Sequence, residues 1–245
     1  ATVNTSKKPF DNNLVRQALN YAVDKQAIAE ALYGGLAVPI PGSVSPAITG
    51  FVDMRGYDYN PDLAKALLAK AGYPNGFSAT IWTPSTGVIM KDIALSETLQ
   101  QYFAAVGVKI KIERMEWAAI SAACKLPMNE NKSEITLEKW PPSTGEATWM
   151  LQASLTKALW PPVGGTRSFY DNPVFEELLD KATASPTVEA RDAYLRAAQI
   201  LLNEDTPFVY LVTPMLIWGK SAKLNDMVFS PLSLTFASEK TWLAK

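Results

Sequence analysis

The chain has no histidine among its 245 residues. A Ser-His-Asp triad, a Cys-His pair, a histidine general base and an imidazole metal site all need that residue, so all four are excluded. The glycine-rich phosphate loops and the metalloprotease and EF-hand motifs are also missing from the sequence. We therefore expect neither a cofactor nor a metal site.

Cysteine is almost as scarce, because Cys124 is the only one. A single thiol can form neither an internal disulfide nor a thiolate zinc site. Cys124 ends a stretch of mostly small apolar residues with helical character that begins at Trp117. In such surroundings we expect a buried, unreactive thiol.

An excess of charge of one sign and long apolar runs are also missing. The 23 basic and 24 acidic residues leave a net charge of −1, which supplies no electrostatic footprint for nucleic acid. The apolar runs are all far shorter than the roughly 18 residues of a membrane span. The chain starts at Ala1 without a basic and apolar leader, so we expect any export signal to have been removed already.

The chain does have 48% hydrophobic residues, and many of them recur at helical spacing. Four helices are predicted to begin after polar residues that can cap a helix N-terminus, here called polar lead residues. In two of these cases a proline suited to the first helical position follows the polar residue. These leads are Asp11–Asn13, Asp24, Asn60–Pro61 and Asn172–Pro173. Two further helices are predicted over Ile93–Val106 and Val188–Asn203.

Two segments, Phe77–Trp82 and Val108–Glu113, alternate apolar and polar residues as half-buried strands do. The helix predicted between them makes a strand–helix–strand unit, which favours parallel pairing. Phe208–Val212 is predicted as a third, buried strand. Together these elements predict an α/β fold with a mixed sheet flanked by helices.

One catalytic pattern is present. Ser154-Leu155-Thr156-Lys157 fits the SxxK motif, in which a lysine amine activates a serine for attack on a carbonyl. The motif fixes only two positions, and the KTG motif that accompanies it is incomplete here, because Lys240-Thr241 is followed by Trp242. A serine acyl-transferring enzyme is therefore the alternative, and our first expectation is a protein without catalytic residues.

Three tryptophans, several prolines and one acid gather between Trp140 and Pro162. Rigid aromatic walls near one carboxylate, Glu146, suit a pocket for a small ligand that bears a cation. The same composition also fits a loop whose tryptophans complete the core while Glu146 lies in solvent. Composition leaves both interpretations open.

The order of several motifs resembles family 5 of the solute-binding proteins, the peptide/nickel class that serves ABC importers. The most specific match runs from Asn4 to Lys25, NTSKKPFDNNLVRQALNYAVDK. Weaker matches follow in order at Tyr59–Leu68, Ala71–Phe77, Val106–Val108, Tyr170–Pro173 and Ala198–Pro207. The resemblance implies the third lobe of a periplasmic-binding-protein-like fold of class II, cluster C.

Within that family, Trp140–Trp149 most resembles the glutathione-binding members, whose cleft loop reads STGEADW. By this resemblance Glu146 meets the α-amino group of the ligand, as an aspartate does in the dipeptide binders. Trp140 and Trp149 become cleft walls, and Ser143 and Thr144 their polar neighbours.

The sequence departs from the family pattern at three places. Lys139 stands where a glycine is usual, and Thr148 replaces a second acid. The arginine that binds the ligand carboxylate in dipeptide binders is missing near Ile93, and Lys91 or Arg167 are the candidates to replace it.

Members of the family are about twice this length. The resemblance therefore implies the C-terminal half of such a protein, with a ligand-binding lobe over about 10–212. Residues 1–9 and about 213–245 are then hinge and return segments to a first lobe. The implied partners are a short peptide or glutathione, ABC permease subunits and the N-terminal lobes, and the implied location is periplasmic or exported and lipid-anchored. Nickel complexes and longer oligopeptides stay open as alternative ligands.

Overall fold

A mixed four-stranded sheet in the order β1-β5-β3-β4 lies at the centre of the computed structural model, which describes residues 1–244 except 86, 141–143, 218, 230–234 and 237–239. Its middle strand β3 (Ser78–Pro84) pairs in parallel with β4 (Lys109–Met115) and with β5 (Ile135–Thr136). The edge strand β1 (Thr2–Val3) runs antiparallel to β5. The predicted parallel unit and the mixed sheet are thus confirmed.

Four helices begin where the polar lead residues predict. Asn12, Asp24, Asn60 and Asn172 each accept a hydrogen bond from a backbone N–H in the first turn of the helix that follows. Such caps satisfy N–H groups that have no partner inside the helix. The helices are α1 (Asn13–Tyr21), α2 (Lys25–Tyr33), α3 (Pro61–Lys70) and α7 (Pro173–Ala184).

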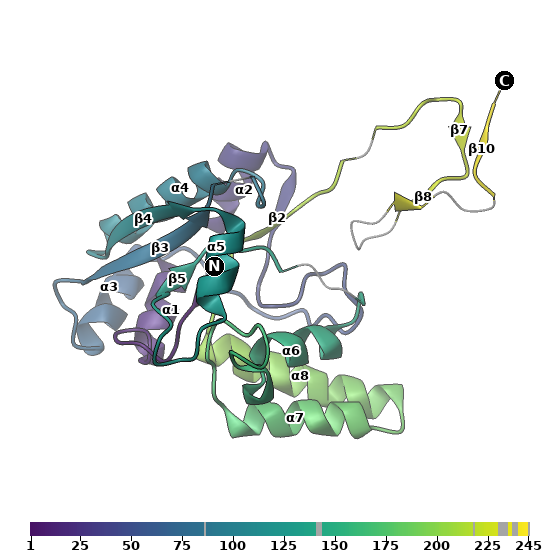
Figure 1. The fold of residues 1–245 in the computed structure, drawn as a ribbon. Coiled ribbons are helices and arrows are strands. Elements are labelled where there is room, and N and C mark those ends of the chain that lie inside the picture. The colour runs from purple at the N-terminus through teal and green to yellow at the C-terminus, as the bar shows by residue number, and fades with distance from the viewer. Residues whose placement is uncertain (86, 141–143, 218, 230–234, 237–239, 245) are drawn as a thin grey trace.

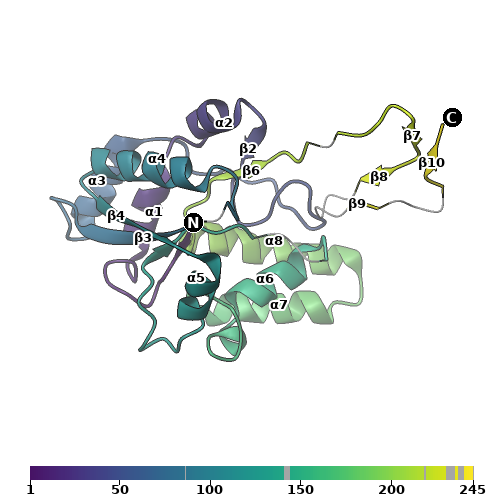
Figure 2. The ribbon, with the colours of Figure 1, turned by 45° about the horizontal axis from the view of Figure 1, so that its top comes forward.

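Five more helical segments complete the lobe: α4 (Asp92–Ala105), α5 (Trp117–Cys124), α6 (Ala147–Leu155), a 3₁₀ turn (Lys157–Leu159) and α8 (Val188–Asp205). Helices α4 and α5 lie on opposite faces of the sheet (Figure 2). Ile81 and Ile110 join the core that contains residues of α1 to α4. On the other face Trp82 packs against Ile120 and Cys124 of α5. The predicted burial of Cys124 is confirmed, and this burial raises the pKa of its thiol.

Helices α6, α7 and α8 form a separate layer beside the sheet (Figure 1). They share a second core, in which Leu151, Phe175 and Leu195 are almost fully buried. The proline-rich connector after α2 adds Val44 and Ile48 to this core, so it links the sheet half of the lobe to the helical half. None of the described helices is both long and apolar enough to cross a membrane.

The third predicted strand, Phe208–Val212, is wrong in its bounds. Only Val212–Pro214 (β6) is a strand, and it pairs antiparallel with β2 (Ala37–Pro39). Phe208 makes a single bridge to Thr2 of β1. The predicted burial is confirmed for Val209, Tyr210 and Leu211.

The C-terminal segment leaves the lobe after β6 and projects away from it (Figures 1 and 2). Its short strands pair with one another, β7 (Leu224–Asn225) with β10 (Trp242–Leu243) and β8 (Val228–Phe229) with β9 (Thr235–Phe236). The first residues of the chain, in contrast, lie inside the sheet as β1.

Candidate functional site

Glu146 begins α6 and holds the start of that helix with its own side chain. Its Oε1 accepts a hydrogen bond from the Thr148 hydroxyl at 2.7 Å, and its Oε2 accepts one from the Trp149 backbone N–H at 3.3 Å. A carboxylate at a helix N-terminus is also stabilised by the helix dipole. Glu146 is therefore a fixed, half-buried negative charge rather than a mobile surface side chain.

The proline-rich connector supports this helix start from the side. The Thr49 N–H donates to the Gly145 carbonyl at 3.1 Å, and the Ala147 N–H donates to the Thr49 carbonyl at 2.9 Å. Gly50 has a φ of +85°, and a Cβ there would lie 3.1 Å from the Ala147 Cβ. Thr49 and Gly50 could not be predicted as part of this site from the sequence, because nothing in their local pattern signals a contact with residues almost a hundred positions away.

The two tryptophans that flank Glu146 lie at the surface. The exposed fraction is 43% for Trp149 and 38% for Trp140, so neither completes the core. Thr144 is exposed next to them, and Ser143 lies outside the described residues. Of the two interpretations that composition left open, the exposure of these side chains favours the wall of an open site.

Trp160, the third tryptophan, is packed differently. Its ring meets that of Phe169 edge-on at 5.7 Å, and its Nε1 donates to the Tyr170 carbonyl at 3.3 Å. This tryptophan stabilises the loop that follows α6, so the core interpretation applies to it.

The two candidates for a ligand carboxylate occupy different environments. Lys91 is exposed at the start of α4 with a left-handed φ of 63°, and its ammonium group makes no ion pair with any described residue. Arg167 forms an ion pair with Glu138, and the exposed fractions of the two side chains are 11% and 4%. The Arg167 guanidinium also lies 4.7 Å from the centre of the Trp117 ring.

Ser154 and Lys157 do not form a catalytic pair. The Ser154 hydroxyl is buried and donates to the Met150 carbonyl one turn back along α6. The Lys157 ammonium pairs instead with Asp171 at the surface and lies 5.0 Å from the Trp160 ring centre. With the lysine turned to solvent, nothing in this arrangement activates the serine.

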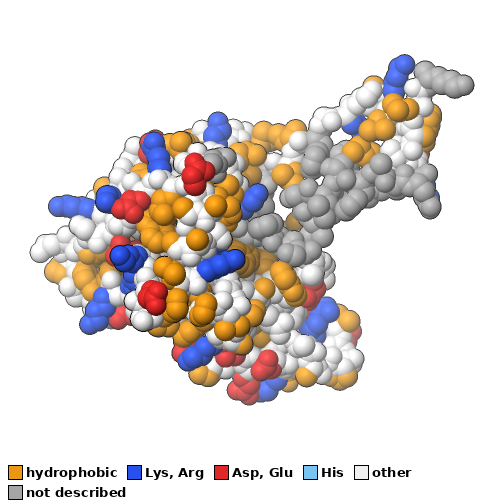
Figure 3. All heavy atoms as spheres, viewed as in Figure 1, with side chains coloured by type: hydrophobic (Ala, Val, Ile, Leu, Met, Phe, Trp, Pro, Cys, Tyr) orange, Lys and Arg blue, Asp and Glu red, His pale blue; other side chains and the backbone are white. Residues whose placement is uncertain are grey.

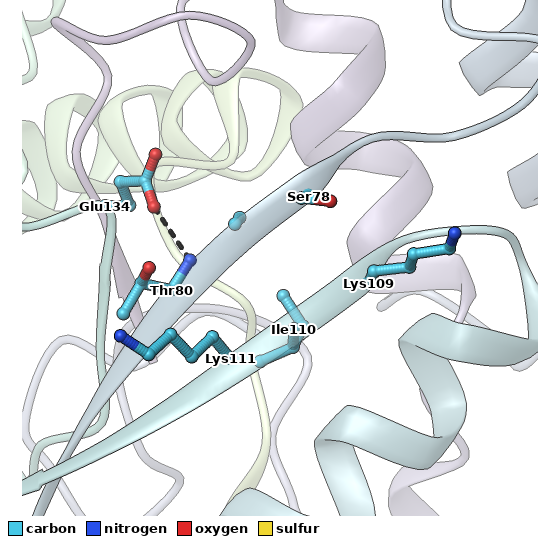
Figure 4. A pocket seen from close by; sticks show the side chains of 7 residues that line it. Ser78, Thr80, Lys109, Ile110, Lys111 and Glu134 are labelled. Carbon is cyan, nitrogen blue, oxygen red and sulfur yellow. Dashed lines mark hydrogen bonds between the residues drawn. The ribbon is translucent and has the colours of Figure 1, made fainter.

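A shallow groove of about 370 Å³ runs along β3 and β4 (Figure 4). The Thr80 backbone N–H donates to the Glu134 carboxylate at 2.7 Å there, and Lys109 and Lys111 line the strand beside it. This groove lies at the amino ends of the strands, whereas open α/β sheets bind ligands outside the carboxyl ends. None of the predicted site residues lines it.

On the face shown in Figure 3, the described basic and acidic side chains are interspersed, as the balanced composition predicts. Among the described residues, no group of three or more cysteine, histidine or acidic side chains could hold a metal ion. The chemistry available at Glu146 is therefore recognition of a cation by a fixed carboxylate beside aromatic surfaces.

Comparison with known proteins identifies several relatives. The chain is 32% identical over 234 residues to the glutathione-binding protein GsiB of Pectobacterium atrosepticum, covering 95% of this chain and 45% of that protein. It is 31% identical over 231 residues to GsiB of Escherichia coli strain K12, covering 94% and 45%. The chain thus spans less than half the length of the curated relatives it matches.

Solved structures resemble the fold closely. The periplasmic binding protein DppA of Helicobacter pylori, associated with an ABC transporter and solved with the peptide STSA, matches with a TM-score of 0.80 and 32% identity. That match covers 87% of this chain and 40% of DppA. A dipeptide-binding protein of Pseudoalteromonas sp. SM9913, solved with Met-Leu, matches with a TM-score of 0.84 and 27% identity over 96% and 46% of the two chains. The predicted α/β fold of a periplasmic binding protein is confirmed.

A family model decides the membership. The model for bacterial extracellular solute-binding proteins, family 5 (Middle), matches residues 1–161, well over half of the chain. The matched model describes solute-binding proteins, which agrees with the expectation of a binder. The chain belongs to the family 5 bacterial extracellular solute-binding proteins.

Proposed function

We propose that this chain forms the C-terminal part of the substrate-binding component of an ABC importer, and that it captures glutathione or a short peptide. The observation that carries the proposal is Glu146, a carboxylate held at the start of α6 beside the exposed Trp149. Relatives that bind glutathione, a dipeptide or a tetrapeptide share the fold and about 30% of the residues.

The proposed site binds the ammonium group of the ligand through Glu146. Each carboxylate oxygen accepts one hydrogen bond from the chain and keeps lone pairs for a ligand donor. Trp140 and Trp149 offer apolar walls, with Thr144 and Ser143 as polar neighbours. A second lobe closing over the ligand would exclude water and strengthen each of these contacts.

Recognition of a ligand carboxylate needs a cation. The sequence offers Lys91 and Arg167 as candidates, and we propose Lys91 for this role. The environment of Lys91 supports it more strongly, because its ammonium group is exposed and makes no ion pair among the described residues. Arg167 already has a carboxylate partner in Glu138.

The proposal also includes partners and a location. The relative from Helicobacter pylori is described as periplasmic and associated with an ABC transporter. We therefore propose that this chain works in the periplasm, with N-terminal lobes like those of its relatives and with ABC permease subunits.

The test is the substitution Glu146→Gln in the complete protein, that is, this chain together with the N-terminal lobes that the relatives have. Calorimetry would compare ligands with free and with N-acetylated amino groups. Loss of one partner of a buried charge pair typically costs about 2–5 kcal/mol, so Glu146→Gln should weaken binding of the free ligand roughly 30-fold to several thousand-fold. Gln keeps the size of the side chain and an oxygen to cap α6.

A matched control is Glu189→Gln, which removes another carboxylate from the first turn of a helix, α8, far along the chain. It should leave the affinity unchanged. If acetylation of the ligand weakens the wild type and Glu146→Gln equally, Glu146 does not bind the ammonium group. If neither glutathione nor any dipeptide binds the wild type, the proposed ligand class is wrong.

A further inference from the structure

An ion pair removed from water stands out in this lobe. The side chains of Glu138 and Arg167 are 4% and 11% exposed, whereas the other ion pairs described here have at least one side chain about half exposed. Burying two charges is costly unless their geometry and additional contacts compensate. Replacing such a pair by apolar residues is often neutral for stability, so stability alone does not explain this pair.

Two further segments, β1 and α5, contact this pair. The Thr2 hydroxyl in β1 donates to the Glu138 carboxylate, and Arg167 belongs to the loop between α6 and α7. The Arg167 guanidinium lies over the ring of Trp117, the first residue of α5, at 4.7 Å. Glu138 therefore contacts β1 and the loop directly, and it is linked to α5 through Arg167.

Glu138 also lies close along the chain to Trp140 of the proposed site. It comes two residues after β5 ends at Thr136 and two residues before Trp140. Two residues of extended chain span at most about 7 Å, so the Cα of Trp140 cannot be farther than that from the Cα of Glu138. Here β5 presents its carboxyl end, where open α/β sheets bind their ligands.

We propose that Glu138 and Arg167 are positioning residues: their ion pair fixes the strand end from which Trp140 enters the site, and Arg167 serves Glu138 rather than a ligand carboxylate. The effect on ligand affinity rests on the proposed function. The effect on the placement of Trp140 does not, so the two can be tested separately.

The test uses Glu138→Gln, Arg167→Met and the double variant Glu138→Met/Arg167→Met. Thermal melting of the 245-residue chain measures stability. The indole N–H signal of Trp140, assigned by its loss in Trp140→Phe, reports the placement of that ring in ¹H–¹⁵N spectra. Ligand affinity is measured by calorimetry in the complete protein.

Each single substitution should lower the melting temperature, because it leaves one charge buried without its partner. The double variant removes both charges and should recover most of that loss. The Trp140 signal should shift from its wild-type position in the single variants and in the double variant alike. The affinity of the double variant should remain about tenfold below wild type, because the ion pair that fixes the strand end is missing. Arg167→Lys keeps a paired charge and should keep the Trp140 signal closer to wild type than Arg167→Met does.

A control is Glu177→Gln, which breaks the exposed pair with Lys181 and should change neither the signal nor the affinity. If the double variant recovers stability, the Trp140 signal and affinity together, the pair is merely structural and the proposal is wrong. It is also wrong if Arg167→Met weakens only ligands with a free carboxylate and spares their amides. If no peptide or glutathione binds the wild type, the proposed function fails, and the Trp140 signal alone still decides the positioning.

Discussion

At the scale of single residues, Lys25 is a cation that the fold places out of reach of water. Its side chain is 7% exposed, and its ammonium group donates to the carbonyl oxygens of Asn20 at 3.0 Å and Tyr57 at 2.8 Å. Desolvation lowers the pKa of Lys25 to about 8, although the carboxylates of Asp58 and Asp24 oppose the shift. The folded state therefore binds this proton less tightly than the unfolded state does.

This lowered pKa predicts a stability that rises with pH. Between about pH 8 and the ordinary lysine pKa near 10.5, the unfolded chain holds the proton that folded Lys25 has released. Lys25 should thus raise the free energy of unfolding by roughly 1 kcal/mol from pH 7 to pH 9. Urea unfolding at each pH measures it.

The control for this prediction is Lys25→Met, in which the rise between pH 7 and 9 should shrink by the Lys25 contribution. The rise that remains belongs to the Ala1 ammonium group, whose pKa burial lowers to about 5. The measurement stays below pH 10 because burial raises the pKa of Tyr57, Tyr170 and Tyr210. Ionisation of these phenols in the unfolded state reduces stability at higher pH. An equal rise in wild type and Lys25→Met would show that another group is responsible.

At the scale of elements, two glycines that precede the neighbouring strands β3 and β4 lie in close contact. Gly76 has a φ of +73°, and a Cβ on it would lie 1.9 Å from the Gly107 carbonyl oxygen. Both glycines belong to motifs shared with the family, Ala71–Phe77 and Val106–Val108. A side chain at Gly76 would push apart the starts of two strands that pair over their full length.

Gly76→Ala should accordingly destabilise the lobe by more than about 2 kcal/mol, from the left-handed backbone and the clash together. Gly34→Ala is the matched control, since its φ is +61° and a Cβ there meets nothing within 4 Å. That substitution carries only the backbone penalty, about 1 kcal/mol. Equal losses in the two variants, measured by denaturant unfolding, would contradict the role of the close approach.

At the scale of the whole molecule, the two tryptophans of the proposed site and part of the C-terminal segment are exposed to solvent. Trp140 and Trp149 are each about 40% exposed, and the C-terminal segment projects away from the lobe with Ile217 and Leu243 about 70% exposed. The relatives of this chain are more than twice as long, so more than half of their chain lies outside the part that matches this one. In a protein that binds ligand by closing two lobes, each lobe supplies only part of the contacts.

The 245-residue chain alone should therefore fold but bind weakly. We expect a native-like circular dichroism spectrum and a cooperative melt, with a Kd for glutathione or a dipeptide above about 1 mM, or less than roughly 4 kcal/mol of binding free energy. Calorimetry measures that affinity. Micromolar binding by this chain would show that one lobe is sufficient.

The sequence by itself determined the local elements of this protein. The helix caps could be predicted because each cap side chain accepts a hydrogen bond from a backbone N–H no more than three residues away. These caps are Asn12, Asp24, Asn60 and Asn172. The alternation of apolar and polar residues predicted β3 and β4, because neighbours in a strand point to opposite faces. The ordered motifs predicted the family, and with it the fold and Glu146 as the candidate site.

Only the tertiary structure decided features that depend on partners distant in the chain. The segment 208–212 has strand-like residues, yet only Val212 belongs to a strand, and Phe208 makes one bridge to Thr2, some two hundred positions earlier. Arg167 has the chemistry to bind a ligand carboxylate, yet Glu138 pairs with it. Lys25 has an ordinary sequence context and a buried ammonium group. Burial and pairing are properties of the space around a side chain, and residues far apart in sequence fill that space.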